Sequence, residues 1–102
     1  MNIQQLRYVV AIANSGTFRE AASKLFVSQP SLSVAIKDLE QELNFQIFTR
    51  TTTGAVLTSQ GMTFYERALE VVRSFDSFEN RYLNASEKGN QFSISSQDRK
   101  SV

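Results

Sequence analysis

A run of amide and hydroxyl side chains between residues 28 and 34 offers hydrogen-bonding groups without formal charge. The amide of Gln29 can pair with N6 and N7 of adenine, and the apolar Val34 suits the methyl group of thymine. Other side chains in and just after this run can hold phosphate groups: Ser28, Ser31, Ser33 and Lys37. Residue types at this spacing predict contact with the base edges and the backbone of duplex DNA.

A second polar group follows at Arg50, Thr51, Thr52 and Thr53. It supplies one cation and three hydroxyl groups, which suit phosphate oxygens next to the bases that the first run would contact. A solvent-exposed hairpin tip that binds nothing could have the same composition. Both interpretations of this segment stay open.

The first run also has an interpretation without a ligand. Ser28 could serve only to cap the helix. Val34 could be an ordinary isolated apolar residue on the surface, and Lys37 could simply be a solvated charge. Asp38 and Glu42, four residues apart, could form an acid/base or metal-binding pair, or simply a solvated face. The residues alone do not decide between insertion into a DNA groove and a surface helix that has no ligand.

Missing residue types restrict the chemistry further. The 102 residues contain no Cys and no His, which excludes a disulfide framework, a thiolate nucleophile, an imidazole base and the usual zinc sites. The longest apolar run, Val9 to Ile12, is too short to span a bilayer, and no secretory signal is visible. We therefore expect a soluble, cytoplasmic binding module that is not an enzyme. The net charge of +1 gives no general basic footprint, so an interaction with DNA must depend on where the charges lie.

Three helices must position the first run. Capping residues and apolar spacing predict a helix from Asn2 to Asn14, which Gly16 ends, and a second helix of about two turns that starts after Thr17. A third helix from Ser28 to Asn44 carries an apolar stripe at Leu32, Ile36, Leu39 and Leu43. Its acidic residues gather in the C-terminal half, so the uncharged N-terminal half is the end suited to DNA.

A hairpin and a long helix follow. The β-branched and aromatic residues from Phe45 to Leu57 predict a β-hairpin, with Gly54 where a positive φ costs little. From Ser59 to Asn84, apolar residues recur at helical spacing on a face too wide for the preceding residues to cover. We expect a partner helix on this face, at Tyr65, Ala68, Val72, Phe75 and Tyr82.

Several motifs between Ile3 and Gly61 resemble one known family. Phe18 follows Gly-Thr, and the run Ser-Gln-Pro-Ser-Leu-Ser starts at residue 28. Further matching positions are Ala21, Ala22, Leu25, Ile36, Leu39, Glu40, Leu43, Phe48, Arg50, Leu57, Thr58 and Gly61. This pattern is similar to the DNA-binding domain of LysR-type transcriptional regulators. The resemblance implies a winged helix-turn-helix, a linker helix that pairs with its twofold mate, and a dimer or tetramer on an interrupted inverted repeat in promoter DNA.

The family's functional positions can be carried over to this sequence. Base-reading positions fall on Gln29, Pro30 and Val34, phosphate-holding positions on Ser33, Lys37 and Arg50, and the wing on Thr51 to Thr53. Two departures remove cations, because Val34 and Thr53 stand where the family often has Arg, and weaker salt dependence is therefore expected. A third departure places Asn44 where Gly is usual, and Asn tolerates the left-handed conformation.

The resulting expectation is a mainly α protein with three parts: a winged helix-turn-helix at residues 1–58, a dimerisation helix at 59–84, and at 85–102 a hinge and the possible first strand of an effector domain, Phe92 to Ser95. Expected partners are double-stranded DNA, a second copy and RNA polymerase, without a membrane. No cofactor is expected in this chain, since the resemblance places a small-molecule co-inducer in the effector domain. The alternative is a helical protein-interaction module without DNA specificity.

Overall fold

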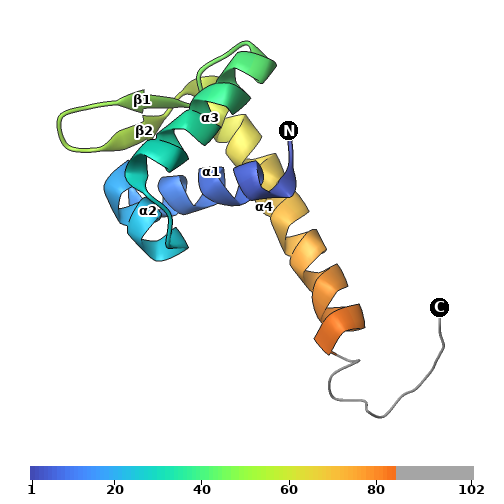
Figure 1. The fold of residues 1–102 in the computed structure, drawn as a ribbon. Helices are drawn as coiled ribbons and strands as arrows, with labels where there is room; N and C mark the ends of the chain where they lie inside the picture. Colours follow the sequence, from blue (N-terminus) through green and yellow to red (C-terminus); the bar gives the residue numbers. More distant parts are fainter. Residues whose placement is uncertain (85–102) are drawn as a thin grey trace. The chain divides into compact units, whose positions relative to one another are not determined.

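The structure is a computed structural model that describes residues 1–84. The chain divides into two compact units, Met1–Val72 and the residues from Arg73 onward. The elements follow in the order α1 (Ile3–Ser15), α2 (Phe18–Leu25), α3 (Gln29–Leu43), β1 (Phe48–Arg50), β2 (Ala55–Leu57), α4 (Ser59–Glu79) and the short π-helix η1 (Asn80–Asn84) (Figure 1). This order confirms the predicted mainly helical fold with one hairpin. The expected hinge and strand at 85–102 lie outside the described residues.

Local capping chemistry explains where the first three helices begin. At α1, Asn2 and Gln5 form a complete capping box, and at α2 the hydroxyl of Thr17 accepts the amide hydrogen of Glu20 (3.0 Å). At α3, the hydroxyl of Ser28 accepts the amide hydrogen of Ser31 (3.2 Å). Pro30 lies in the first turn of α3, where a missing amide hydrogen leaves no bond unmade.

Left-handed residues end the same three helices. Gly16 has φ +86° after α1, Phe26 has φ +60° after α2, and Asn44 has φ +66° after α3. Asn44 therefore fills the position of the family's usual glycine as predicted. Gly16 and Phe26 therefore lie at the changes of direction between α1, α2 and α3, and Asn44 lies where the chain leaves α3.

One apolar core holds α1, α2, α3 and β1 together. Its buried side chains are Val9, Ile12, Phe18, Ala21, Ala22, Leu32, Ile36, Leu39, Ile47 and Phe48. The residues buried among the three helices include most of the stripe predicted on the third helix. Leu43 is partly buried and packs against the same core. Because one side of α3 is packed into this core, its opposite, outward side is held in a fixed position.

The hairpin is a two-stranded antiparallel sheet in which Phe48 pairs with Leu57, Thr49 with Val56 and Arg50 with Ala55. The expectation of a positive φ at Gly54 was wrong, since Gly16 is the one glycine with positive φ among residues 1–84. Gly54 is needed for close approach instead, because a β-carbon there would overlap the carbonyl oxygen of Gly16. That oxygen also accepts the amide hydrogen of Ala55 (2.8 Å), which joins the hairpin to the end of α1.

The backbone of Ile47, just before β1, is fixed from both sides. Its amide donates to Glu40 Oε2 (2.7 Å), which also accepts from the amide of Phe48 (3.2 Å). Its carbonyl oxygen accepts the amide hydrogen of Thr58 (2.9 Å), and Gly61 packs so closely on it that a β-carbon would overlap that oxygen. This junction joins α3, the hairpin and the start of α4.

The fourth helix is shorter than predicted. The α-helix ends at Glu79, and residues 80–84 continue as a π-helix, so the expected uniform helix from Ser59 to Asn84 was wrong in its last turn. Its first part belongs to the first unit, where Ala68 and Val72 are buried against Leu6 of α1. None of the helices within residues 1–84 has both the length and the apolar character needed to cross a membrane.

Candidate nucleic-acid interface

The N-terminal half of α3 carries the predicted base-reading residues on an exposed face. Gln29 and Pro30 are exposed, and Val34 keeps 57% of its surface accessible although it is apolar. Because α3 is fixed by its buried stripe, these three side chains stand on a rigid support. Their arrangement allows an amide and an apolar group to meet a flat, polar surface such as a set of base edges.

The serines of this helix are not equivalent. Ser28 and Ser31 are exposed and bonded to each other, with Ser28 Oγ donating to Ser31 Oγ (2.8 Å). Ser33 lies farther along and is half-buried, facing the hairpin. The predicted phosphate-holding serines therefore form two separate groups, one at the helix start and one beside β1.

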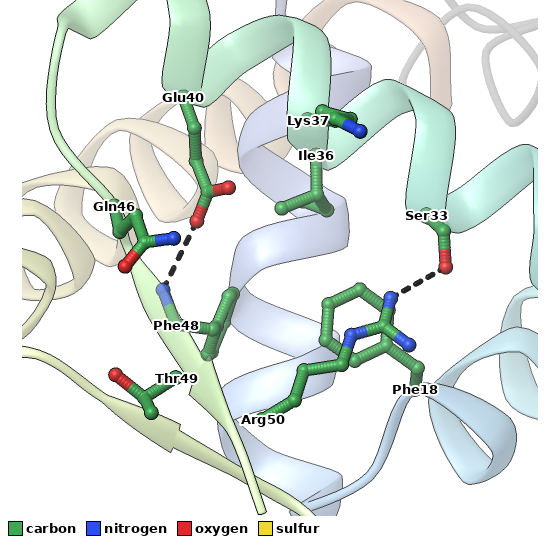
Figure 2. Close-up of a pocket in the computed structure, with 9 residues that line it drawn as sticks. All are labelled: Phe18, Ser33, Ile36, Lys37, Glu40, Gln46, Phe48, Thr49 and Arg50. Carbon is green, nitrogen blue, oxygen red and sulfur yellow. Dashed lines mark hydrogen bonds between the residues drawn. The ribbon is translucent and has the colours of Figure 1, made fainter.

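Arg50, at the end of β1, lies across the space between the hairpin and α3 (Figure 2). Its guanidinium carbon is 3.7 Å from the centre of the Phe18 ring, and its Nη2 donates to Ser33 Oγ (2.6 Å). Phe18 is itself buried and packs edge-on against Phe48, with ring centroids 5.8 Å apart. A planar cation over an aromatic face is a favourable electrostatic arrangement.

Lys37 shares a groove with Arg50. This groove has a volume of about 480 Å³, and Ser33, Ile36, Phe48 and Thr49 also line it. Figure 2 shows the groove between α3 and the hairpin, with the Lys37 ammonium group on the α3 side. Two cations and the Glu40 carboxylate therefore border one open groove, and that carboxylate already accepts from the amides of Ile47 and Phe48. Lys37 and Arg50 can supply a local positive charge although the net charge of the chain is only +1.

A second hollow, of about 230 Å³, brings Gln29 of the first predicted cluster together with the second cluster. Gln29 lines it from α3, while Arg50 and the threonines at 51–53 line it from the hairpin. Arg19, near the start of α2, is a further cation in its wall that the sequence did not single out. Base-reading and wing residues that are about twenty positions apart in the sequence thus face one space.

The wing tip is an ordered turn. Thr51 and Gly54 exchange backbone hydrogen bonds. The amide of Thr51 donates to the carbonyl oxygen of Gly54 (2.7 Å), and the amide of Gly54 donates to the carbonyl oxygen of Thr51 (3.3 Å). The hydroxyl of Thr51 adds a bond to the Gly54 carbonyl (3.0 Å) and lies 3.3 Å from the hydroxyl of Thr53. All three threonines remain exposed, so their hydroxyl groups border solvent on a fixed support.

The predicted dimerisation residues fall into different surroundings. Ala68 and Val72 are buried within the first unit, and the hydroxyl of Tyr65 donates to Asn14 Oδ1 (2.9 Å). Phe75 is half-buried in the second unit, where Tyr82 is exposed. The burial of Ala68 and Val72 therefore needs no second copy of the chain.

Two of the three acidic residues of α3, Glu40 and Glu42, form contacts within the chain that were not predicted from the sequence. Glu40 holds the amides of Ile47 and Phe48, and Glu42 forms an ion pair with the amino group of Met1 (2.8 Å). One signal was available for Glu40, since it follows Ile36 by four residues and precedes Leu43 by three, which places it on the apolar stripe. No group of three or more candidate metal-binding side chains occurs within residues 1–84.

Three helices, a sharp turn before the exposed one and an antiparallel wing beside it define a winged helix-turn-helix domain. The family model described as "Bacterial regulatory helix-turn-helix protein, lysR family" matches residues 3–62, more than half of the chain. The chain therefore belongs to the LysR family of bacterial regulatory helix-turn-helix proteins.

Known proteins agree with this assignment. The chain is 43% identical over 76 residues to the HTH-type transcriptional regulator BudR of Klebsiella aerogenes, a match that covers 74% of this chain and 53% of BudR. It is 46% identical over 61 residues to a probable RuBisCO transcriptional regulator of Guillardia theta, covering 60% of this chain and 20% of that protein. The solved CbnR_DBD-DNA complex matches with a TM-score of 0.76 and 31% identity, over 84% of this chain and 99% of that one.

Proposed function

We propose that this chain is a sequence-specific DNA-binding module of a transcriptional regulator. The N-terminal half of α3 enters the major groove, where Gln29, Pro30 and Val34 face the base edges. The wing at residues 51–53, with Arg50 and Lys37, contacts the flanking backbone. The observation that carries this proposal is the hollow lined jointly by Gln29, Arg50 and the wing threonines. The likeness to the DNA complex of the CbnR DBD supports it.

The assembly is part of the same proposal. The chain spans about half of BudR and a fifth of the Guillardia theta regulator, so the properties of a whole regulator are proposed from its family. We propose a dimer, or a tetramer in the full-length protein, on an interrupted inverted repeat in promoter DNA in the cytoplasm. A small-molecule co-inducer would act on an effector domain, RNA polymerase would be a further partner, and this chain itself would have no catalytic role.

The second unit supplies the surface proposed for self-association. Phe78, Tyr82 and Leu83 are exposed at 62%, 58% and 59%. The ring centroids of Phe78 and Tyr82 lie 5.0 Å apart, so these two rings form one apolar patch. A second copy of the same helix offers the matching surface that a twofold interface requires.

Selection of bound duplexes from a random library, followed by sequencing, tests the DNA-binding proposal. We expect an inverted repeat whose half-sites are separated by whole helical turns, because a dimer presents two copies of α3 to one face of the duplex. Enrichment of a single half-site would retain base reading and refute the dimer on DNA. If no motif is enriched, the chain is better described as a helical protein-interaction module, for which the exposed aromatic surface of the second unit is the supporting observation.

The substitution Phe78→Asp tests the dimer in the absence of DNA. A charge in the centre of the apolar surface should convert the dimer to a monomer, as measured by light scattering. Met62→Asp is the matched control, since Met62 is exposed at 50% on the same helix but lies in the first unit. An unchanged mass for Phe78→Asp, or the same loss for Met62→Asp, would contradict the proposed surface.

A further inference from the structure

The hydroxyl of Ser33 is already bonded within the chain. It accepts a hydrogen bond of 2.6 Å from Nη2 of Arg50, a residue seventeen positions later. The same guanidinium lies on the ring of Phe18, 3.7 Å from its centre. Arg50 is therefore held by two groups from two different helices (Figure 2), although the residue as a whole is exposed.

Both holding groups are fixed by the fold. Phe18 is 6% exposed and is locked edge-on against Phe48. Ser33 follows Leu32, which is completely buried. About two turns farther along α3, Glu40 bonds the amides of Ile47 and Phe48 at the start of β1, so the distance between α3 and the Arg50 strand is also set.

A cation fixed in this way loses little freedom when it binds. An arginine side chain has several rotatable bonds, and immobilising such a side chain at an interface weakens binding by about 2- to 10-fold. Stacking on Phe18 limits the guanidinium to one plane, and Ser33 fixes its rotation in that plane. The remaining N–H groups of the guanidinium are then available to an anion in a set direction.

We propose that Ser33 is a positioning residue for Arg50: it orders the guanidinium on Phe18 before that group meets a phosphodiester of the DNA backbone. This inference rests on the proposed function and changes the role of Ser33 within it, from a phosphate contact to a group that acts through Arg50. The DNA chemistry recognised is a single backbone phosphate beside the major groove that α3 enters.

A double-mutant cycle separates the two roles. Ser33→Ala, Arg50→Ala and the double variant are titrated against a mixed-sequence duplex pool, because a phosphate contact does not depend on the bases. Ser33→Ala should weaken binding about 2- to 10-fold when Arg50 is present, and should change nothing further in the Arg50→Ala background. Equal weakening in both backgrounds would show direct contact between Ser33 and DNA, and would overturn the proposal, as would no weakening in either.

Two further variants keep the cycle interpretable. Arg50→Met keeps an unbranched apolar stem at this position but removes the guanidinium. It should abolish the effect of Ser33→Ala, as Arg50→Ala does. Ser31→Ala is the matched control on α3, because the Ser31 hydroxyl is bonded to Ser28 and not to Arg50. Its effect should be the same whether Arg50 is present or absent. Coupling of Ser31 to Arg50 as strong as that of Ser33 would contradict a specific positioning role.

A measurement without DNA tests the same contact. The Phe18 ring current should shift the Arg50 side-chain resonances in the NMR spectrum of the wild-type chain, and Ser33→Ala should move them toward the values of a mobile arginine. Unchanged resonances would overturn the positioning role even if the chain binds DNA. If the wild type binds no duplex, the proposed function fails and this inference fails with it, whereas an additive cycle on DNA that is bound refutes this inference alone.

Discussion

The two halves of α3 both carry polar side chains, uncharged in the N-terminal half and mostly charged in the C-terminal half, and use them differently. In the N-terminal half, Gln29 and Val34 are exposed on the outward face, and Ser28 and Ser31 bond only to each other and to the helix start. In the C-terminal half, Glu40 bonds two amides of the hairpin and Glu42 pairs with the amino group of Met1. The N-terminal half therefore presents Gln29 and Val34 outward, and Ser33 is its one side chain that bonds another element. The C-terminal half fixes the helix to the rest of the unit through Glu40 and Glu42.

Because of this difference, we expect substitutions in one half of the helix to change the affinity for DNA and substitutions in the other half to change the stability of the fold. Changes at Glu40 should alter the free energy of unfolding, because they remove the two hydrogen bonds that hold α3 to the start of β1. Changes at Gln29 should alter DNA binding and leave unfolding unchanged, because this side chain lies on an exposed surface. A helix of fifteen residues is thus expected to show two kinds of mutational effect, according to position.

The largest effect is expected where the start of α4 packs on Ile47, from Gly61→Ala. A β-carbon at residue 61 would overlap the carbonyl oxygen of Ile47 and lie 2.8 Å from the carbon of the same group. Backbone atoms must shift to relieve this overlap, which we expect to destabilise the chain by about 3 kcal/mol or more. Urea denaturation followed by circular dichroism measures the loss.

Gly16→Ala is the control for this substitution. Gly16 has φ +86° but has no neighbour within 4 Å of an added β-carbon, so only the left-handed backbone resists the change, at about 1 kcal/mol. Equal losses for the two variants would show that the close approach at Ile47 does not matter.

The next largest effect is expected from Glu40→Ala. The amides of Ile47 and Phe48 would both lose their acceptor in a partly buried site, which should cost about 2–4 kcal/mol of stability. Glu40→Gln keeps an oxygen in the same place and should cost less than half as much. A loss for Glu40→Gln as large as that for Glu40→Ala would mean that the negative charge, and not the hydrogen bonds, holds the hairpin.

Short-range signals made most of the fold predictable. Capping residues and apolar spacing identified all three helices of the domain within one or two residues, because these signals depend on neighbours in the sequence. The role of Gly54 was not predictable, since its constraint comes from Gly16, thirty-eight residues earlier. The change to a π-helix at residues 80–84 follows Glu79, where a polar residue interrupts the apolar spacing, but an interruption alone does not predict a π-helix.

The candidate site was predictable as a set of residues and not as a geometry. Side-chain chemistry and the family resemblance singled out Gln29, Ser33 and Arg50, but neither indicated that Ser33 and Arg50 bond to each other. The ring of Phe18 under Arg50 is likewise a contact between segments that are distant in sequence. Such contacts depend on how α2, α3 and the hairpin pack, and a single sequence states no packing directly.

Gln29→Ala should have the smallest effect on the fold and a selective effect on binding. Loss of a bidentate amide contact should weaken binding to the enriched motif by about 1–3 kcal/mol, with little change on random DNA and none in the unfolding midpoint. The matched control is Gln41→Ala, which removes the same side chain from the other half of α3, where Gln41 is also exposed. Fluorescence anisotropy titrations with both duplexes measure the difference. Equal weakening on motif and random DNA would mean that Gln29 contacts only the backbone, and equal effects at Gln29 and Gln41 would refute the division of α3 into a binding half and an anchoring half.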